Sequence, residues 1–158
     1  MSASQPSIHA GCVLVGPFGL LLRGASGSGK SALADCLVQQ AGAKGHFAAH
    51  VSDDRTVLEG RTGGILVARP AKGLEGLLEV RGAGILSVAH EPEAVIRLIV
   101  DLLPAGKIDR LPEHQILEEL VEGVLVARIE VAANLPQEAI RRIRWAFLRL
   151  FPNSSGYL

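Results

Sequence analysis

A glycine-rich run near the N-terminus has the residue types and spacing of a phosphate-binding loop. It reads Gly24-Ala25-Ser26-Gly27-Ser28-Gly29-Lys30-Ser31. The glycines allow the backbone to curl so that successive N–H groups point inward and form an anion-binding nest. A helix that begins at about Gly29 would add the positive end of its dipole, Lys30 would bring a full charge to the β- and γ-phosphates, and the Ser31 hydroxyl would ligate Mg²⁺. The run therefore predicts a site for a nucleoside triphosphate.

The segments on either side of this run support the prediction. Residues 19–23, Gly-Leu-Leu-Leu-Arg, are typical of a strand, and a turn at 16–19 joins them to a second predicted strand at 11–15. Residues 31–41 carry apolar side chains at helical spacing, with Gly42 just past the predicted end. A strand before the motif and a helix after it are the setting that a phosphate-binding loop requires. A glycine-rich turn with a chance lysine is the weaker alternative.

Two adjacent carboxylates, Asp53 and Asp54, follow a predicted strand at 47–51. A carboxylate at a strand end beside a phosphate-binding loop is where Mg²⁺ finds its second protein contact. One carboxylate can hold the metal while the other accepts a proton from an attacking hydroxyl. The sequence leaves open which of the two does which. The alternative is a turn in which these side chains only cap the strand.

The centre of the chain is rich in predicted strands, and the last element is a predicted helix. Strands are expected at 56–59, 64–68, 77–80, 85–89 and 124–131. Residues 94–103 form either a strand or a short helix, and their valine and isoleucine content favours the strand. Pro136 suits the first turn of a helix, and apolar side chains then recur at helical spacing as far as Leu150 or Phe151. The arginines of this helix lie mostly off that stripe, where they are either solvated or form a docking surface for a partner. Together these elements predict an α/β fold with a strand-rich centre and a C-terminal helix.

Composition predicts one globular domain over residues 1–158, with its core at about 7–151. The hydrophobic fraction is 48% and the charged fraction 20%. Sixteen basic and sixteen acidic residues balance, so net charge does not favour nucleic acid or a membrane surface. The two cysteines lack a metal-ligand spacing and are expected to be free thiols.

Residues 1–6 lack the features of a signal peptide and no apolar run has the length of a membrane span, so a cytoplasmic location is predicted. Residues 153–156 are expected to fray.

Three segments together resemble the HPr kinase/phosphorylase family, bacterial enzymes that act on a serine of the phosphocarrier protein HPr. They are the phosphate-binding loop, the Val-Ser-Asp-Asp step at 51–54, and the segment 78–86, which is similar to the family's Leu-Glu-Ile-Arg-Gly-x-Gly-Ile pattern. Ser7-Ile8-His9 resembles the segment with the family's histidine, expected before the first strand. The resemblance covers about residues 7–150. It implies a P-loop kinase domain related to the nucleotide site of phosphoenolpyruvate carboxykinase, in the short single-domain form found in alphaproteobacteria.

The resemblance also implies roles for particular residues. Asp53 would be the general base that deprotonates the target serine, and the acid in the reverse, dephosphorylating reaction. Lys30 and His9 would complete the catalytic set. Asp54 and Glu79 would join Ser31 around Mg²⁺. Without the resemblance, Glu79 reads as an exposed residue of an edge strand next to a bulge at Gly82 and Gly84, and His9 as a surface histidine.

The resemblance further implies partners. ATP with Mg²⁺ would be the phosphoryl donor and an HPr-like protein the acceptor. Arg128 is the nearest equivalent of an arginine in the loop with which the family docks HPr. The larger enzymes of the family are hexamers, so self-association is expected.

Two other functions fit the same nucleotide site. A small-molecule kinase would share the loop and the carboxylate base, but such enzymes usually add a mobile lid with arginines, and the middle of this sequence has no lid-like arginine cluster. A nucleotide sensor would signal to a partner through the basic C-terminal helix. The presence of Lys30, Ser31, Asp53 and Asp54 argues against lost chemistry. A protein-serine kinase of the HPr type is therefore the favoured prediction.

Overall fold

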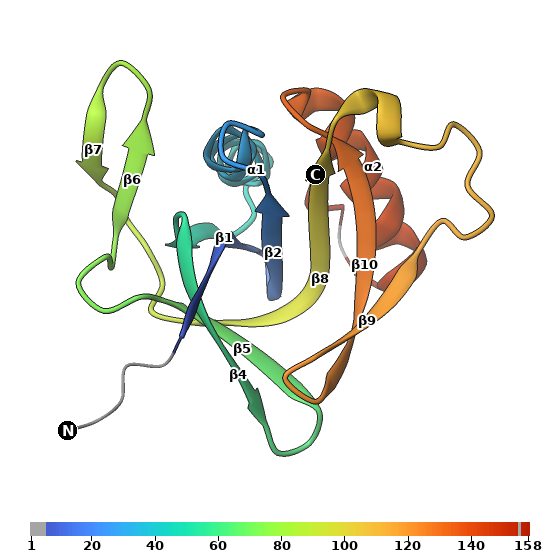
Figure 1. Ribbon diagram of the computed structural model, residues 1–158, viewed down its shortest axis with the longest axis horizontal. Coiled ribbons are helices and arrows are strands. Elements are labelled where there is room, and N and C mark those ends of the chain that lie inside the picture. The colour runs from blue at the N-terminus through green and yellow to red at the C-terminus, as the bar shows by residue number, and fades with distance from the viewer. Residues whose placement is uncertain (1–5, 155) are drawn as a thin grey trace.

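The computed structural model describes residues 6–154 and 156–158 and shows a large curved sheet with two helices on one face (Figure 1). The helices are α1 (Lys30–Ala43) and α2 (Pro136–Leu150), and a short 3₁₀ helix spans Ala105–Lys107. A separate hairpin is formed by β6 (Leu77–Val80) and β7 (Gly84–Ser87). The large sheet contains β1 (Ser7–Val15), β2 (Phe18–Gly24), β3 (Ala48–Ser52), β4 (Arg55–Arg61), β5 (Ile65–Pro70), β8 (Ala94–Leu103), β9 (Leu117–Val121) and β10 (Val124–Ala132).

The strand pairings of the large sheet close on themselves. The order is β2-β1-β4-β5-β8-β10-β9, with β3 on β1, and β2 also pairs with β8. β8 pairs with β5 near its start and with β2 and β10 along the rest, and it curves visibly between these partners (Figure 1). β2, β8 and β10 run parallel. Their carboxyl ends therefore meet at one edge, which is where ligands bind in α/β sheets.

Two apolar clusters fill the molecule, one on each face of the central strands. The first lies between the sheet and the helices and includes Leu33 and Leu37 of α1 and Ile143 of α2. The second lies on the other face and includes Leu66 and Ile99. β2 contributes to both, because its successive leucines point to opposite faces of the sheet. A strand buried on both faces reads as a continuous apolar run, which explains the Leu-Leu-Leu before the loop.

The predicted fold class is confirmed, and several boundaries differ. α1 continues through Gly42 to Ala43, and the chain turns instead at Gly45, where φ is 79°. His9 lies within β1 and not before the first strand, because residues 7–9 pair with β4. β9 was not predicted. It pairs with β10 through a tight turn at Glu122 and Gly123, where φ is 48° and 76°.

The hairpin β6–β7 also differs from the prediction. Gly82 and Gly84 adopt φ of 86° and 91° in its turn, so they make a hairpin turn and not a bulge in an edge strand. The hairpin stands apart from the large sheet (Figure 1). Ile85, near its tip, is 70% exposed.

The C-terminal segment packs on the body of the protein and was wrongly expected to fray at Asn153 and Ser154. The Ser154 N–H donates to the Phe151 carbonyl, and Leu158 is 3% exposed within the first cluster. Tyr157 sits so close to the turn between β1 and β2 that a Cβ on Gly16 would lie 2.5 Å from its ring. Ser155 lies outside the described residues, as do residues 1–5, on which most of the signal-peptide prediction depends. Within the described part of the chain, no helix is long and apolar enough to cross a membrane.

Candidate nucleotide and phosphoryl-transfer site

The glycine-rich run lies where β2 ends and α1 begins, at the edge formed by the parallel strands. Gly27 and Gly29 adopt left-handed φ of 80° and 91°, which L-residues with a side chain rarely adopt. The Ser28 N–H donates to the Ala25 carbonyl at 3.0 Å, and Gly29 precedes the first residue of α1. Ala25, Ser26 and Gly27 are exposed at the tip. The backbone is therefore curled at the N-terminus of a helix of fourteen residues, the geometry of an anion-binding nest.

Lys30 is a buried cation beneath this loop, with only 7% of the residue exposed. Its Nζ donates to the carbonyls of Gly24 at 2.9 Å and Ala25 at 3.1 Å. Burial lowers the pKa of the Lys30 ammonium, and the charges of Asp54 and Asp53 oppose that shift. Among the described residues, Ser28 Oγ is the buried side-chain atom without a hydrogen-bond partner. An incompletely solvated cation under a curled backbone suits a polyphosphate.

Asp53 connects the start of α1 to the hairpin. Its Oδ1 accepts a hydrogen bond from Ser31 Oγ at 2.6 Å, and its Oδ2 accepts one from the Glu79 backbone N–H at 3.0 Å. Asp53 follows β3, and Ser31 is the second residue of α1. The carboxylate therefore lies beside the hydroxyl that was predicted to ligate Mg²⁺.

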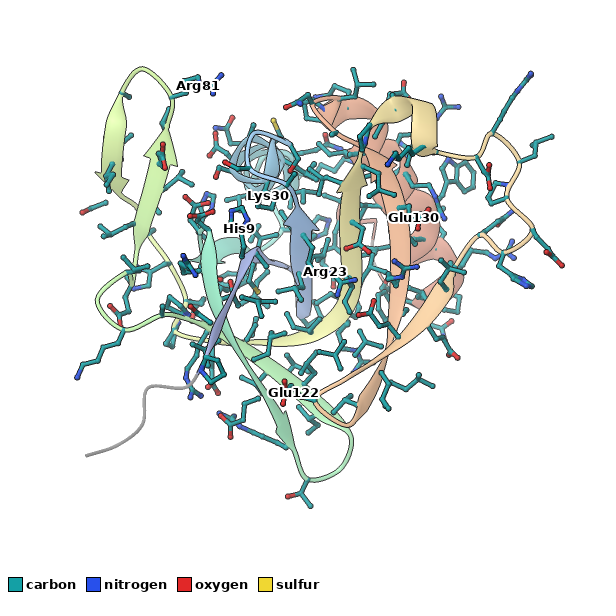
Figure 2. All side chains as sticks on the ribbon, viewed as in Figure 1. His9, Arg23, Lys30, Arg81, Glu122 and Glu130 are labelled. Carbon is teal, nitrogen blue, oxygen red and sulfur yellow. The ribbon has the colours of Figure 1, made fainter. Side chains whose placement is uncertain are left out.

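Asp54 and His9 form a second contact next to the first. Asp54 adopts a left-handed φ of 65° in the tight turn between β3 and β4, and its Oδ1 contacts Nε2 of His9. The Ala10 N–H donates to the Asp54 carbonyl, so β1 and the turn are also joined through their backbones. The charge of Asp54 also acts on Lys30, and Figure 2 labels His9 and Lys30 close together in the view. The structure thus brings His9, Lys30, Ser31, Asp53 and Asp54 to one region.

A magnesium ion fits the oxygen donors of this region. Among the described residues, no group of three His, Cys, Asp or Glu side chains is close enough to hold a metal ion. Mg²⁺ does not need such a cage, because it binds one or two carboxylates plus substrate phosphates and keeps several waters. Ser31 and Asp53 offer oxygens of that kind side by side. Glu79 is exposed and meets Asp53 through its backbone N–H.

Arg128 lies elsewhere, in a cluster of ion pairs on the central strands. Its guanidinium lies 2.8 Å from Asp101 and 3.6 Å from Glu119 and from Glu130. Arg23, the residue before the loop, makes paired hydrogen bonds with Asp101 and with Glu119. These bonds to Arg23 are the main reason that the pKa of Glu119 lies below its usual value. Arg128 is therefore already engaged within the chain.

Sequence reasoning missed Asn134, which contacts the glycine-rich loop from the turn between β10 and α2. Its Nδ2 donates to the Gly27 carbonyl at 3.0 Å. The signal that points to it is an asparagine two residues before the proline that starts a helix, since asparagine tolerates the left-handed backbone of such turns.

A family model described as HPr Serine kinase C-terminal domain matches residues 1–134. The chain belongs to this family. The match ends at the turn before α2, and it includes the loop, both aspartates and the hairpin.

Individual members of the HPr serine kinase family are similar in sequence to this chain over part of their own length. An HPr kinase/phosphorylase of Limosilactobacillus reuteri is 30% identical over 165 residues, which cover 98% of this chain and 49% of the relative. The HPr kinase/phosphorylase of Lactobacillus acidophilus is 32% identical over 89% of this chain and 44% of its own length. That of Bordetella pertussis is 31% identical over 84% of this chain and 44% of its own length. The chain thus spans about half the length of these curated relatives.

A solved structure has the same fold. It is the HPr(Ser) kinase/phosphatase from Coxiella burnetii, with a TM-score of 0.75, 23% sequence identity, and coverage of 92% of each chain. The curved sheet, the two helices and the glycine-rich loop thus belong to a known architecture.

Proposed function

We propose that this chain is an ATP- and Mg²⁺-dependent protein-serine kinase that phosphorylates an HPr-like phosphocarrier protein. The observation that supports this most directly is the hydrogen bond of 2.6 Å between Asp53 and Ser31. It puts a carboxylate beside the loop and Lys30, where a γ-phosphate and an incoming hydroxyl would meet. Membership of the HPr serine kinase family and the names of its relatives support the choice of acceptor.

In the proposed in-line phosphoryl transfer, each site residue has a separate role. The loop amides and Lys30 bind the phosphates and balance the charge that develops on them. The acceptor serine oxygen forms a bond to the γ-phosphorus while the bond from that phosphorus to the bridging oxygen of ADP breaks. The Asp53 carboxylate orients the serine hydroxyl and takes its proton. A magnesium ion held by Ser31 and a carboxylate would neutralise the phosphate oxygens.

Asp54 and His9 form the supporting pair of the proposed site. The contact between His9 Nε2 and Asp54 Oδ1 holds the second carboxylate next to Asp53. We assign this pair to orientation of the metal and of the acceptor. In the phosphorylase reaction, which the names of the relatives include, an oxygen of inorganic phosphate would bond to the phosphoserine phosphorus while its bond to the serine oxygen breaks, and Asp53 would give that serine oxygen a proton. A cytoplasmic location completes the proposal, since both cysteines are free thiols.

Phosphoryl transfer from labelled ATP to HPr tests the proposal. The wild-type chain with Mg²⁺ is expected to label one serine of HPr. Asp53→Asn should lower the rate at least about 100-fold, the usual range for loss of a general base, while its Kd for ATP stays within about threefold. Asp109→Asn, at an exposed carboxylate outside the site, is the matched control and should transfer normally. ATP binding by the wild type without transfer to HPr would refute the proposal.

Lys30→Ala tests the nucleotide part on its own. The substitution removes the buried ammonium from the loop, and a charge-assisted contact contributes enough that the Kd for ATP should rise about 100-fold. Lys44→Ala, just past the other end of α1, is exposed and should bind ATP as the wild type does. If Lys30→Ala also binds ATP normally, the glycine-rich run is not the phosphate site.

A further inference from the structure

Asn134 occupies a fixed position between β10 and α2. Its backbone is left-handed, with φ of 58°, a conformation that asparagine adopts more readily than most residues. The residue before it is held by a hydrogen bond of 2.7 Å from the Ala133 N–H to the Leu103 carbonyl at the end of β8. Pro136 then starts α2. Two elements therefore set where Asn134 lies.

Asn134 contacts three consecutive residues of the glycine-rich loop. Its Nδ2 donates to the Gly27 carbonyl at 3.0 Å, and its backbone N–H donates to the Ser28 carbonyl at 2.9 Å. A Cβ added to Gly29 would lie 2.9 Å from Asn134 Oδ1, so the Gly29 backbone packs directly on this amide. Two of these three residues, Gly27 and Gly29, have left-handed backbones.

These hydrogen bonds determine which way the peptide groups of the loop face. The C=O and N–H of a trans peptide point in opposite directions. When the Ser28 carbonyl is bonded to Asn134, the N–H of Gly29 in the same peptide must point away from Asn134. The bond to the Gly27 carbonyl fixes the preceding peptide in the same manner, and its N–H donates to the Ala25 carbonyl across the loop.

We propose that Asn134 is a positioning residue for phosphate binding: it holds the carbonyls of Gly27 and Ser28 so that the loop is curled before nucleotide arrives. A loop that is already curled loses less conformational freedom on binding, which increases affinity. The inference rests on the nucleotide-binding part of the proposed function. It adds a residue at the junction of β10 and α2 to a site otherwise built from the first 54 residues and the hairpin.

Two substitutions separate the effect of the hydrogen-bond donor of the Asn134 side chain from the effect of its shape. Asn134→Gly keeps the left-handed backbone and its N–H and removes only the side chain. Asn134→Asp keeps the shape but places a carboxylate oxygen against the Gly27 carbonyl and near the bound phosphates. With a hydrogen bond of ordinary strength, Asn134→Gly should weaken ATP binding about 5- to 10-fold, measured by titration calorimetry. Asn134→Asp should weaken it about tenfold further, because like charges repel.

Amide hydrogen exchange in the nucleotide-free protein gives a reading that does not depend on ATP. In Asn134→Gly the Ser28 amide should exchange about fivefold faster, with the melting temperature close to that of the wild type. Asn153→Gly, an exposed asparagine of the C-terminal segment, is the matched control and should change neither measurement.

The outcomes distinguish this inference from the proposed function. Wild-type protein that fails to bind ATP would refute the proposed function, and the exchange of the Ser28 amide would still decide the role of Asn134. If the Ser28 amide of Asn134→Gly exchanges as slowly as in the wild type, the inference is overturned. It is also overturned if Asn134→Gly binds ATP more weakly than Asn134→Asp does, because that order indicates that packing was lost and not a hydrogen-bond donor.

Discussion

Lys30 is a charged side chain that burial has largely removed from water. In water an ammonium is fully hydrated, whereas Lys30 Nζ is held by two loop carbonyls beneath a curled backbone. Burial is the main cause of its lowered pKa, and the negative charges of the neighbouring aspartates raise that pKa part of the way back. A polyphosphate bound in the loop would add negative charge close to the ammonium and so raise the pKa of Lys30 again.

This difference in pKa predicts how ATP binding depends on pH. The charged ammonium binds phosphate, so affinity is full below the pKa of the nucleotide-free protein and falls as pH rises through it. Because burial lowers that pKa from the usual 10.5, the decline should begin at a lower pH than an unperturbed ammonium would give. Kd values measured with EDTA between pH 7 and 10 should show it. Lys44→Ala should keep the wild-type profile, whereas the residual binding of Lys30→Ala should lack this decline. A flat wild-type profile up to pH 10 would contradict the prediction.

At the scale of the elements, the hairpin β6–β7 is joined to the candidate base by a hydrogen bond. A hairpin of two strands is marginally stable alone in water. Here Val88 N–H donates to the Gly76 carbonyl at its base, and the Glu79 N–H donates to Asp53. The same aspartate also accepts a hydrogen bond from the Ser31 hydroxyl. The position of the hairpin is thus coupled to the start of α1 through one carboxylate.

Removing that carboxylate should free the hairpin. In Asp53→Ala the Glu79 amide loses its acceptor, and its hydrogen exchange should accelerate about tenfold, the value of one hydrogen bond to a charged group. Exchange followed by NMR measures this amide by amide. Glu79→Ala is the control, because it keeps the backbone N–H and Asp53, so the exchange of that amide should stay slow. Equal exchange in Asp53→Ala and the wild type would show that the hairpin is held by other contacts.

Local signals predicted the elements whose stability is local. The glycine spacing located the loop, and apolar residues at helical spacing located α1 and α2, each within a few residues. β9 was missed because Glu118 and Glu119 resemble a solvated segment. Arg23, 96 residues away in the sequence, pairs with Glu119 in the folded chain. Pairing over that distance leaves no periodic pattern in either segment.

The candidate site was likewise predicted only where its residues are close together in the sequence. The sequence identified the loop and the two aspartates from adjacent residues, and their chemical roles stay predictions. It could not show that Asp53 reaches both Ser31 and the Glu79 amide, since those contacts require the β3–β4 turn, α1 and the hairpin to be in place. Asn134 is 107 residues from Gly27, so its contact with the loop depends on the parallel pairing of β10 with β8.

At the scale of the whole molecule, the two apolar clusters share their central strands. Leu20 and Leu22 of β2 face the helices, whereas Leu21 faces the second cluster. β8 is divided likewise, with Leu98 in the first cluster and Ile99 in the second. Loss of packing on one face therefore weakens the strands that support the other.

We accordingly propose that the described chain unfolds as one cooperative unit. Leu66→Ala lies in the second cluster, and a cavity there should lower the free energy of unfolding by about 2–4 kcal/mol. Trp145, the single tryptophan of the sequence, lies on α2, on the opposite face of the sheet. In urea, its fluorescence and the circular dichroism of the backbone should nevertheless shift to the same lower midpoint, because neither cluster persists without the shared strands. Leu111→Ala, at a side chain 89% exposed, should leave both midpoints unchanged. A fluorescence midpoint that stays at the wild-type value while the dichroism midpoint falls would show that the helical face folds independently.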